Sequence, residues 1–351
     1  MERTVVIIHP GAVGDVLLAV PAMRGIRARF PRHELLLCAH EQVARLLQKC
    51  RVIDAWMSVG SSDCAELFGR SAEVPGVLKD WLGRCDLAVA WMQDESGTVA
   101  AVLQRGGAKD VRVRSPFSSQ LFARHQSDRF AEAIGEPATA SSPPIALAVP
   151  DHLLMRGLAC LEERGVRADQ PIILVHPGSG SRHKCVGPEV LLPVMKQLQD
   201  EGAFPVVLEG PADHESVRNL LTAFSKKPPV LRGLDLCTLA GLLAHMQLFI
   251  GHDSGMTHLS SLVGLRTVAL FGPTDPVRWA PRGRLVTVAR GTACTCRSWD
   301  AVIQCIEKPC LALSVEKIVS ACRIQHPEGA NPRNPSRSSL SQPTPYAKVA
   351  S

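Results

Sequence analysis

Short β-branched runs alternate with longer helical stretches along the chain, and this alternation constrains the fold more than any other feature of the sequence. In the first third, the predicted strands are Val5–Ile8, Leu35–Cys38, Ala55–Val59, Asp86–Ala90 and Val111–Val113. The stretches between them with helical periodicity are Val16–Arg29, Glu41–Lys49, Val74–Leu82 and Thr98–Arg105. Strands and helices in this order build a parallel sheet flanked by helices, so an α/β unit is predicted.

The alternation stops at a Pro-rich stretch and then restarts. Residues Gly135–Pro150 contain prolines among Ala and Ser, the composition of a linker. Beyond it, the predicted strands are Ile172–Val175, Val206–Leu208, Val230–Leu231, Leu248–Ile250 and Thr267–Leu270, and the predicted helices are Pro188–Asp200, His214–Phe224, Asp235–His245 and Gly255–Val263. Two Rossmann-like domains, residues 1–150 and 151–325, are therefore predicted, with a cleft between them. Residues 326–351 are rich in Pro and Ser, so this tail is expected to be disordered.

The composition argues against several classes of protein. The formal net charge is only +6, spread along the chain, and aromatic residues make up 4% of it. No repeated alternation of aromatic and basic residues is found, so no nucleic acid partner is predicted. No apolar run has the roughly 18–20 residues of a membrane span, and His9, Pro10 and Asp15 interrupt the first apolar stretch before it reaches signal-peptide length. Twelve cysteines without a secretory signal indicate a reducing compartment, so a cytoplasmic location is expected.

The first candidate site is the loop His9-Pro10-Gly11-Ala12-Val13-Gly14-Asp15, between the first predicted strand and the first helix. In an open α/β sheet this is the carboxyl edge, where ligands bind. Asp15 stands at or near the helix start, where it could be the N-cap. Its carboxylate could instead act as a general base that takes the proton of a bound hydroxyl. The loop is neither a dinucleotide-binding GxGxxG motif nor a P-loop.

The second candidate site follows the predicted strand Ile172–Val175. Here Ser179, Gly180 and Ser181 offer backbone N–H groups and hydroxyls, and Arg182 and Lys184 add positive charge. These donors and cations at a sheet edge predict a diphosphate site, although a solvated polar loop would have a similar composition.

The third candidate site follows the predicted strand Leu248–Ile250. A helix that begins at Ser254 or Gly255 would aim its free N–H groups at a phosphate in the cleft. Asp253 could cap this helix or accept hydrogen bonds from sugar hydroxyls, and His258 lies one helical turn beyond Ser254 and faces the same way. The last loop, residues 271–281, is rich in Gly and Pro and is predicted to be rigid and non-helical.

Four late cysteines form a cluster in the sequence, namely Cys294, Cys296, Cys305 and Cys310. Zinc sites usually contain paired Cys-x2–4-Cys spacings, which this cluster lacks. We interpret these residues as structural or free thiols and predict no metal site.

Taken in order, the loops His9–Asp15, His176–Lys184 and Asp253–His258, followed by Gly272-Pro273-Thr274-Asp275-Pro276, resemble those of the bacterial heptosyltransferases, glycosyltransferase family 9. The resemblance extends over roughly residues 4–320, and four motifs in order are more specific than any one alone. It implies a GT-B fold, in which an N-terminal acceptor-binding domain faces a C-terminal nucleotide-sugar-binding domain. Members of the family transfer heptose from ADP-heptose to the inner core of lipopolysaccharide at the cytoplasmic face of the inner membrane.

The resemblance also implies roles for individual residues. Asp15 matches the carboxylate that activates the acceptor, and Lys184 matches the lysine that binds phosphate. Further donor contacts are matched by Asp253, Ser254, Gly255 and His258. Asp213 and Glu215 are two candidates for the acidic contact to the ribose. The sequence departs from the family pattern at Val186-Gly187, where Trp-Pro is usual.

These assignments predict an inverting glycosyltransferase. Asp15 would accept the proton of the attacking hydroxyl, while Lys184, the amides of residues 179–181 and the helix start at Ser254 would stabilise the leaving diphosphate. Such fixed donors make a divalent cation unnecessary, so no cofactor is expected. The expected partners are a nucleotide sugar, ADP-heptose, and a lipid A-core acceptor at the inner membrane surface. The alternatives are a nucleotide-sugar epimerase of GT-B fold and a non-catalytic nucleotide-sugar-binding protein.

Overall fold

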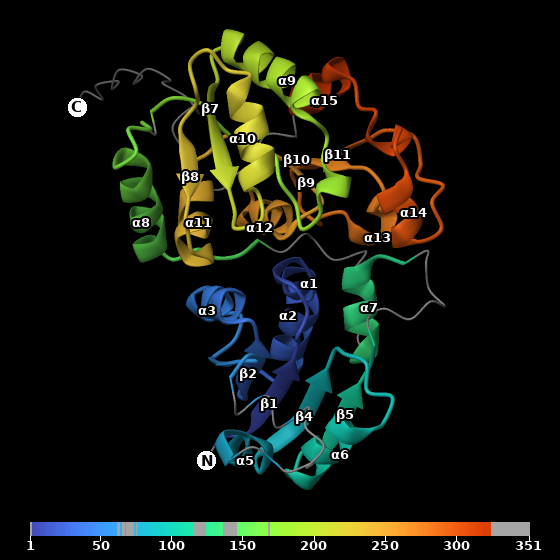
Figure 1. Ribbon diagram of the computed structural model, residues 1–351. Helices are drawn as coiled ribbons and strands as arrows, with labels where there is room; N and C mark the ends of the chain where they lie inside the picture. The colour runs from blue at the N-terminus through green and yellow to red at the C-terminus, as the bar shows by residue number, and fades with distance from the viewer. Residues whose placement is uncertain are drawn as a thin grey trace, which may run out of the picture.

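The chain forms two α/β units, one above the other in Figure 1, as a computed structural model shows. The structure describes residues 2–61, 64, 67, 74, 76–115, 124–135, 146–167 and 169–323. Most of the predicted linker and the predicted disordered tail, residues 326–351, lie outside these ranges, so the domain boundary at residue 150 stays a prediction. Within these ranges, no helix is long and apolar enough to cross a bilayer.

The N-terminal unit is built on a parallel five-stranded sheet in the order β3-β2-β1-β4-β5. Its strands are β1 (Thr4–Ile8), β2 (Glu34–Ala39), β3 (Ala55–Ser58), β4 (Cys85–Ala90) and β5 (Asp110–Val113). Its helices are α1 (Val13–Leu18), α2 (Val20–Arg29), α3 (Glu41–Lys49), α5 (Gly76–Leu82), α6 (Thr98–Arg105) and α7 (Gln126–Ala133). The single helix predicted at Val16–Arg29 is two helices that meet at Ala19. The break precedes Pro21, which has no N–H group to donate to the preceding turn.

The C-terminal unit is built on a parallel six-stranded sheet in the order β11-β10-β9-β6-β7-β8. Its strands are β6 (Ile172–His176), β7 (Phe204–Glu209), β8 (Val230–Arg232), β9 (Leu248–His252), β10 (Thr267–Phe271) and β11 (Val286–Arg290). Its helices are α8 (Asp151–Glu162), α9 (Pro188–Asp200), α10 (His214–Thr222), α11 (Leu236–Leu243), α12 (Gly255–Val263), α13 (Pro276–Trp279), α14 (Trp299–Gln304) and α15 (Val315–Arg323). Both sheets have the strand order of a Rossmann fold, as predicted.

A second part of the prediction is also wrong. Residues 271–281 were expected to be non-helical, but α13 lies within them. Pro276 occupies the first turn of this short helix, where its missing N–H group is not needed. The Asp275 side chain caps the helix by accepting a hydrogen bond from the Val277 N–H group.

The two units share an apolar core. The central strands β1 and β6 are buried along their whole length, as strands covered on both faces must be. One continuous cluster of buried apolar side chains extends from the first sheet into α11 and α12 of the second unit. Contacts of α1 with α12 and of α3 with α11 therefore hold the carboxyl edges of the two sheets against each other.

Polar contacts also join the two units beside this core, where α7 lies beneath α13 in Figure 1. The Arg282 guanidinium binds the Asp128 carboxylate through two hydrogen bonds of 2.5 and 2.6 Å. His125 Nε2 lies 2.8 Å from the Ala280 carbonyl oxygen, and Arg278 Nε donates to Gln126 Oε1. Burial lowers the pKa of His125 to about 4, so this imidazole is neutral at physiological pH. These contacts fix the loop that follows β10 against the N-terminal unit.

Candidate functional site between the two sheets

The loops predicted as sites meet between the two sheets. Figure 1 shows α1 beneath α12, and the contact between them is made by glycines. A Cβ atom on Gly255 would lie 3.2 Å from the Gly14 nitrogen, and one on Gly14 would lie 3.2 Å from His258 Cδ2. Only residues without a side chain allow the two backbones to approach so closely. The first and third loops therefore belong to one site, with contributions from both units.

Asp15 is the third residue of α1 and faces this junction. The N-cap of α1 is Ala12, so the prediction that Asp15 itself could be the N-cap is wrong. Burial raises the pKa of the Asp15 carboxyl, opposed by a hydrogen bond with the Ala12 backbone. The negative charge of Asp253 raises this pKa further, while Lys184 lowers it. A carboxylate whose pKa is raised by burial is a stronger proton acceptor than an exposed one, which suits a general base.

Lys184 and Asp253 form an ion pair in the C-terminal unit. Lys184 Nζ lies 2.8 Å from Asp253 Oδ2, and the Asp253 side chain is almost fully buried. The N-cap of α12 is Ser254, so the capping alternative for Asp253 is wrong. His258 Nε2 lies 4.0 Å from Asp253 Oδ1, but burial lowers the pKa of His258 to about 4, so its ring is neutral at physiological pH. Lys184 therefore supplies the positive charge that faces Asp253.

The loop around Lys184 is held by two residues that the sequence did not single out. The ring of Trp299, from α14, lies 5.9 Å from Lys184 Nζ, within the range of a cation–π contact. The Val186 N–H group donates to His252 Nε2 over 3.0 Å, and the Val186 side chain is buried. The loop around Lys184 is therefore held by a histidine of β9 and by a tryptophan 115 positions along the sequence from Lys184.

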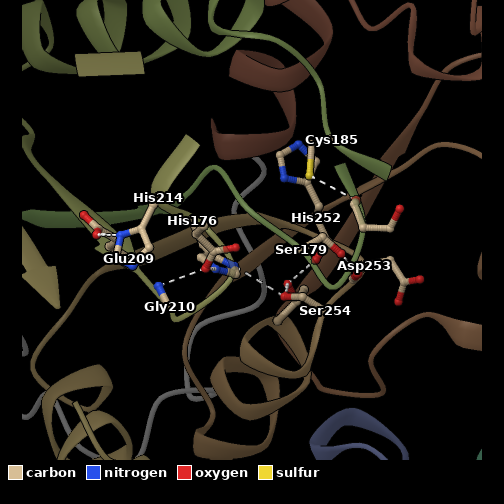
Figure 2. Close-up of polar contacts among 12 residues, drawn as sticks. His176, Ser179, Cys185, Glu209, Gly210, His214, His252, Asp253 and Ser254 are labelled. Atoms are coloured by element: carbon tan, nitrogen blue, oxygen red, sulfur yellow. Dashed lines mark hydrogen bonds and ion pairs between the residues drawn. The ribbon is translucent and has the colours of Figure 1, made fainter. Parts of the chain in front are cut away.

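The serines of the second loop hold its shape. Ser179 donates its hydroxyl proton to the Asp253 carbonyl oxygen over 2.6 Å, which ties the second loop to the third (Figure 2). Ser181 caps the short 3-10 turn η4 (Arg182–Lys184) by accepting from the His183 N–H group. A Cβ atom on Gly180 would meet nothing within 4 Å, so this glycine borders open space. The Ser179 hydroxyl proton is therefore used within the protein, whereas the Ser181 hydroxyl only accepts.

The two ribose candidates have different surroundings. Asp213 is buried, and its Oδ2 atom accepts from His176 Nε2 and from the Gly210 N–H group, both over 2.8 Å. Glu215 is exposed on α10 and lines a cavity of about 190 Å³ together with Pro177, Arg182 and Asn219. The geometry favours Glu215 as the acidic residue that a nucleotide could reach.

Arg278 is a further charged residue at the junction that sequence reasoning missed. Its guanidinium lies 4.7 Å from the Trp279 ring and is close enough to Asp15 for each charge to stabilise the other. Burial lowers the pKa of Arg278, and Asp15 opposes this change. The only signal in the sequence was its position in the loop after the last predicted strand.

The four late cysteines lie together in the structure. The Cys296 thiol contacts those of Cys294 and Cys305, and the Cys310 thiol contacts that of Cys294. Partial burial and these neighbouring thiols raise the pKa of Cys296. In the part of the chain that the structure describes, no group of three or more His, Cys, Asp or Glu residues is arranged to hold a metal ion. The absence of a metal requirement stays a prediction.

Two Rossmann-like units whose carboxyl edges face each other form a GT-B fold. More specifically, the chain belongs to glycosyltransferase family 9 (heptosyltransferase), whose family model matches residues 107–310, more than half of the chain.

Two relatives in Escherichia coli are both lipopolysaccharide heptosyltransferase 3. One is 30% identical over 125 residues, which are 34% of this chain and 36% of the relative. The other, from strain K12, is 22% identical over 300 residues, which are 76% of this chain and 82% of the relative.

Solved structures share the fold. The family 9 glycosyltransferase of Veillonella parvula has a TM-score of 0.76 at 20% identity, covering 92% of this chain and 97% of that one. The Escherichia coli ADP-heptose lipopolysaccharide heptosyltransferase II has a TM-score of 0.69 at 19% identity, covering 91% and 97%. An Escherichia coli heptosyltransferase with ADP has a TM-score of 0.60 at 18% identity, covering 88% and 100%.

Proposed function

We propose that this glycosyltransferase transfers heptose from ADP-heptose to the inner core of lipopolysaccharide with inversion at the anomeric carbon. The observation that carries the proposal is the placement of Asp15, from the N-terminal unit, opposite the Lys184–Asp253 pair of the C-terminal unit. An acceptor bound to one unit and a donor bound to the other would meet between these side chains. The heptosyltransferase with ADP, a structure of the same fold, supports a nucleotide sugar as donor.

The reaction would proceed in one displacement. The acceptor oxygen attacks the anomeric carbon, and its proton passes to the Asp15 carboxylate. The bond between that carbon and the diphosphate oxygen breaks, and ADP leaves with the electron pair from the opposite face. A positioned general base of this kind contributes about 10²–10⁴-fold to the rate.

The C-terminal unit would stabilise the charge that develops on ADP. The Lys184 ammonium has three N–H donors, so it can retain Asp253 while donating to a phosphate oxygen. The first turn of α12, with Ser254 and Gly255, directs free N–H groups toward the same region. Because these donors are fixed before the substrate arrives, they supply positive potential without a divalent cation.

The remaining contacts of the donor follow from the same arrangement. Asp253 would accept hydrogen bonds from the sugar hydroxyls, His258 would pack behind it as a neutral ring, and Glu215 would accept from the ribose hydroxyls. We place the acceptor, a lipid A-core, at the inner membrane surface, where the chain would work as a peripheral protein in the cytoplasm. Its net charge of +6 is compatible with an anionic lipid surface.

The experiment that tests this function incubates the purified chain with ADP-heptose, with and without a heptose-free core acceptor, and analyses the products by mass spectrometry. We expect ADP and a heptosylated acceptor, formed only when both substrates are present. An isomerised nucleotide sugar formed without acceptor would indicate an epimerase instead. A donor that binds and remains unchanged under all conditions would indicate a non-catalytic binding protein.

A further inference from the structure

Three side chains form a line beneath the proposed phosphate site, and the reaction described above leaves two of them without a role. Asp213 Oδ2 lies 2.8 Å from His176 Nε2, and His176 Nδ1 lies 3.4 Å from Ser254 Oγ. Figure 2 shows His176 between Gly210 and Ser254. His176 and Asp213 are both more than nine-tenths buried. The line leads from the interior of the C-terminal unit to the first turn of α12.

Two glycines lie beside this line. A Cβ atom on Gly178 would lie 1.8 Å from Asp213 Oδ1, inside the carboxylate. A Cβ atom on Gly251, which pairs with His176 across the sheet, would lie 2.6 Å from the Phe249 ring and 3.3 Å from His176 Cβ, so this glycine makes room mainly for Phe249 beside His176. The Asp213 carboxylate therefore lies directly beneath the second loop, and the imidazole lies between β6 and the start of α12.

The hydrogen bonds fix the state of Asp213. Burial would raise the pKa of its carboxyl, but the bonds from His176 and from the Gly210 N–H group outweigh burial and hold the pKa below its usual value. Asp213 is therefore an anion that accepts from His176 Nε2–H. This bond leaves Nδ1 facing Ser254.

Ser254 is placed to use that contact. It is the N-cap residue of α12, but its side chain makes no capping hydrogen bond. Its other neighbour is Thr257 Oγ1 at 3.2 Å, and Thr257 gives its own proton to the His252 carbonyl oxygen. Thr257 therefore has no proton left to donate to Ser254, and His176 Nδ1 is in position to donate to the Ser254 oxygen when the hydroxyl proton turns to a phosphate.

We propose that His176, held by Asp213, is a positioning residue that orients the Ser254 hydroxyl toward the diphosphate of the donor. In the complex, Nδ1 takes up a proton from solvent and donates to Ser254 Oγ, and the hydroxyl proton turns to a phosphate oxygen. The Asp213 carboxylate stabilises the resulting imidazolium. This inference rests on the proposed function, because it requires a diphosphate at the start of α12.

Two titratable groups beside this line, His252 and Cys185, are neutral, while Asp253, the residue before Ser254, is paired with Lys184. Burial lowers the pKa of His252 to about 4, so its ring on β9 carries no charge at physiological pH. Burial raises the pKa of the Cys185 thiol, on the second loop, to about 12.

The test uses two isosteres of the imidazole. Asn places an amide near the position of Nδ1 and can still donate to Ser254, whereas Gln places an amide near Nε2 and keeps only the bond to Asp213. ADP affinity is measured by calorimetry for the wild type, H176N, H176Q, S254A and the double variant H176Q/S254A. We expect H176Q and S254A each to weaken ADP binding at least about tenfold, the usual range for one hydrogen bond to a charged group. We expect H176N to remain within about threefold of the wild type, and the double variant to match S254A.

Equal losses for H176N and H176Q would overturn the proposal, because the ring would then serve only to support the fold. A second measurement leaves His176 unchanged. It compares the wild type with S254A in the number of protons taken up when ADP binds. That number is obtained by calorimetry in buffers that differ in ionisation enthalpy. More protons taken up by the wild type would support the proposal, and equal uptake would contradict it. If the wild-type protein bound none of ADP, GDP, UDP and pyrophosphate, this result would contradict the proposed function itself.

Discussion

Replacing Gly178 by Ala tests the packing beneath the second loop. The added Cβ atom would lie 1.8 Å from Asp213 Oδ1, 2.1 Å from its Cγ and 2.7 Å from its Cβ, whereas ordinary contact begins at 3.4 Å. The carboxylate would have to move by roughly 1.6 Å, and because the Asp213 Cβ atom is also too close, the backbone must move with it. A shift of this size breaks the 2.8 Å bonds from His176 and Gly210.

The cost follows from the groups left without partners. Breaking the hydrogen bond between the buried Asp213 carboxylate and the buried His176 imidazole should lower the free energy of unfolding by about 2–4 kcal/mol. This is the range for buried polar groups and ion pairs that lose one partner. For a unit of roughly 150–200 residues, this corresponds to a Tm lower by about 4–16 °C.

Differential scanning calorimetry measures this change, and the same loop provides the control. Gly180 has no atom within 4 Å of an added Cβ and no left-handed backbone angle, so Gly180→Ala should leave the Tm within about 1 °C of the wild type. Equal Tm values for Gly178→Ala, Gly180→Ala and the wild type would refute the argument that Asp213 occupies the space that a Cβ atom on residue 178 would need.

The remaining predictions concern the charged residues of the junction. Lys184→Ala should weaken ADP binding by about 1.5–3 kcal/mol, because it removes a charge-assisted hydrogen bond to phosphate, and unchanged affinity in calorimetry would remove Lys184 from the site. Asp253→Asn should keep or raise ADP affinity but lose about 2 kcal/mol or more in kcat/KM with the full nucleotide sugar, and wild-type kinetics would exclude a contact to the sugar. The raised pKa of Asp15 predicts that kcat/KM falls on the acid side at a higher pH than for an ordinary carboxyl, which a pH–rate profile measures. Because the pKa of Asp15 is raised in the folded state, its carboxyl favours the folded state only when it is protonated, at low pH. Asp15→Asn should therefore raise the Tm at neutral pH and have no such effect below about pH 4. Thermal melts of the wild type and the variant at the two pH values would detect this difference.

The features that the sequence predicted are those that depend on local patterns. The strands β1 to β10, the helices α3, α9 and α12 and the loops at the strand ends follow from periodicity and glycine placement, which neighbouring residues determine, whereas the edge strand β11 is not among the predicted strands. The helix α13 is only one turn long, so the glycines and prolines around it dominate the local pattern, although Asp275-Pro276 is a recognisable start signal.

The features that the sequence did not predict depend on residues far apart in the chain. Trp299 contacts Lys184, and Arg278 faces Asp15, only because the fold brings distant loops together. Asp213 was a candidate for the ribose, but its bond to His176, 37 positions away, gives it an internal partner that no local pattern indicates. The sequence leaves a capping and a catalytic interpretation open for Asp15, and a capping and a sugar-binding interpretation open for Asp253. The positions of Ala12 and Ser254 as N-caps exclude the two capping interpretations.

The most direct test of the central claim measures single-turnover transfer by Asp15→Asn beside its affinity for ADP. Asn has nearly the same shape as Asp and no basic carboxylate, so it removes the base while leaving the donor site of the other unit in place. We predict turnover at least about 10²-fold below the wild type, with ADP affinity within about twofold of it. Turnover near that of the wild type would show that Asp15 only supports the start of α1, and would contradict a site shared between the two units.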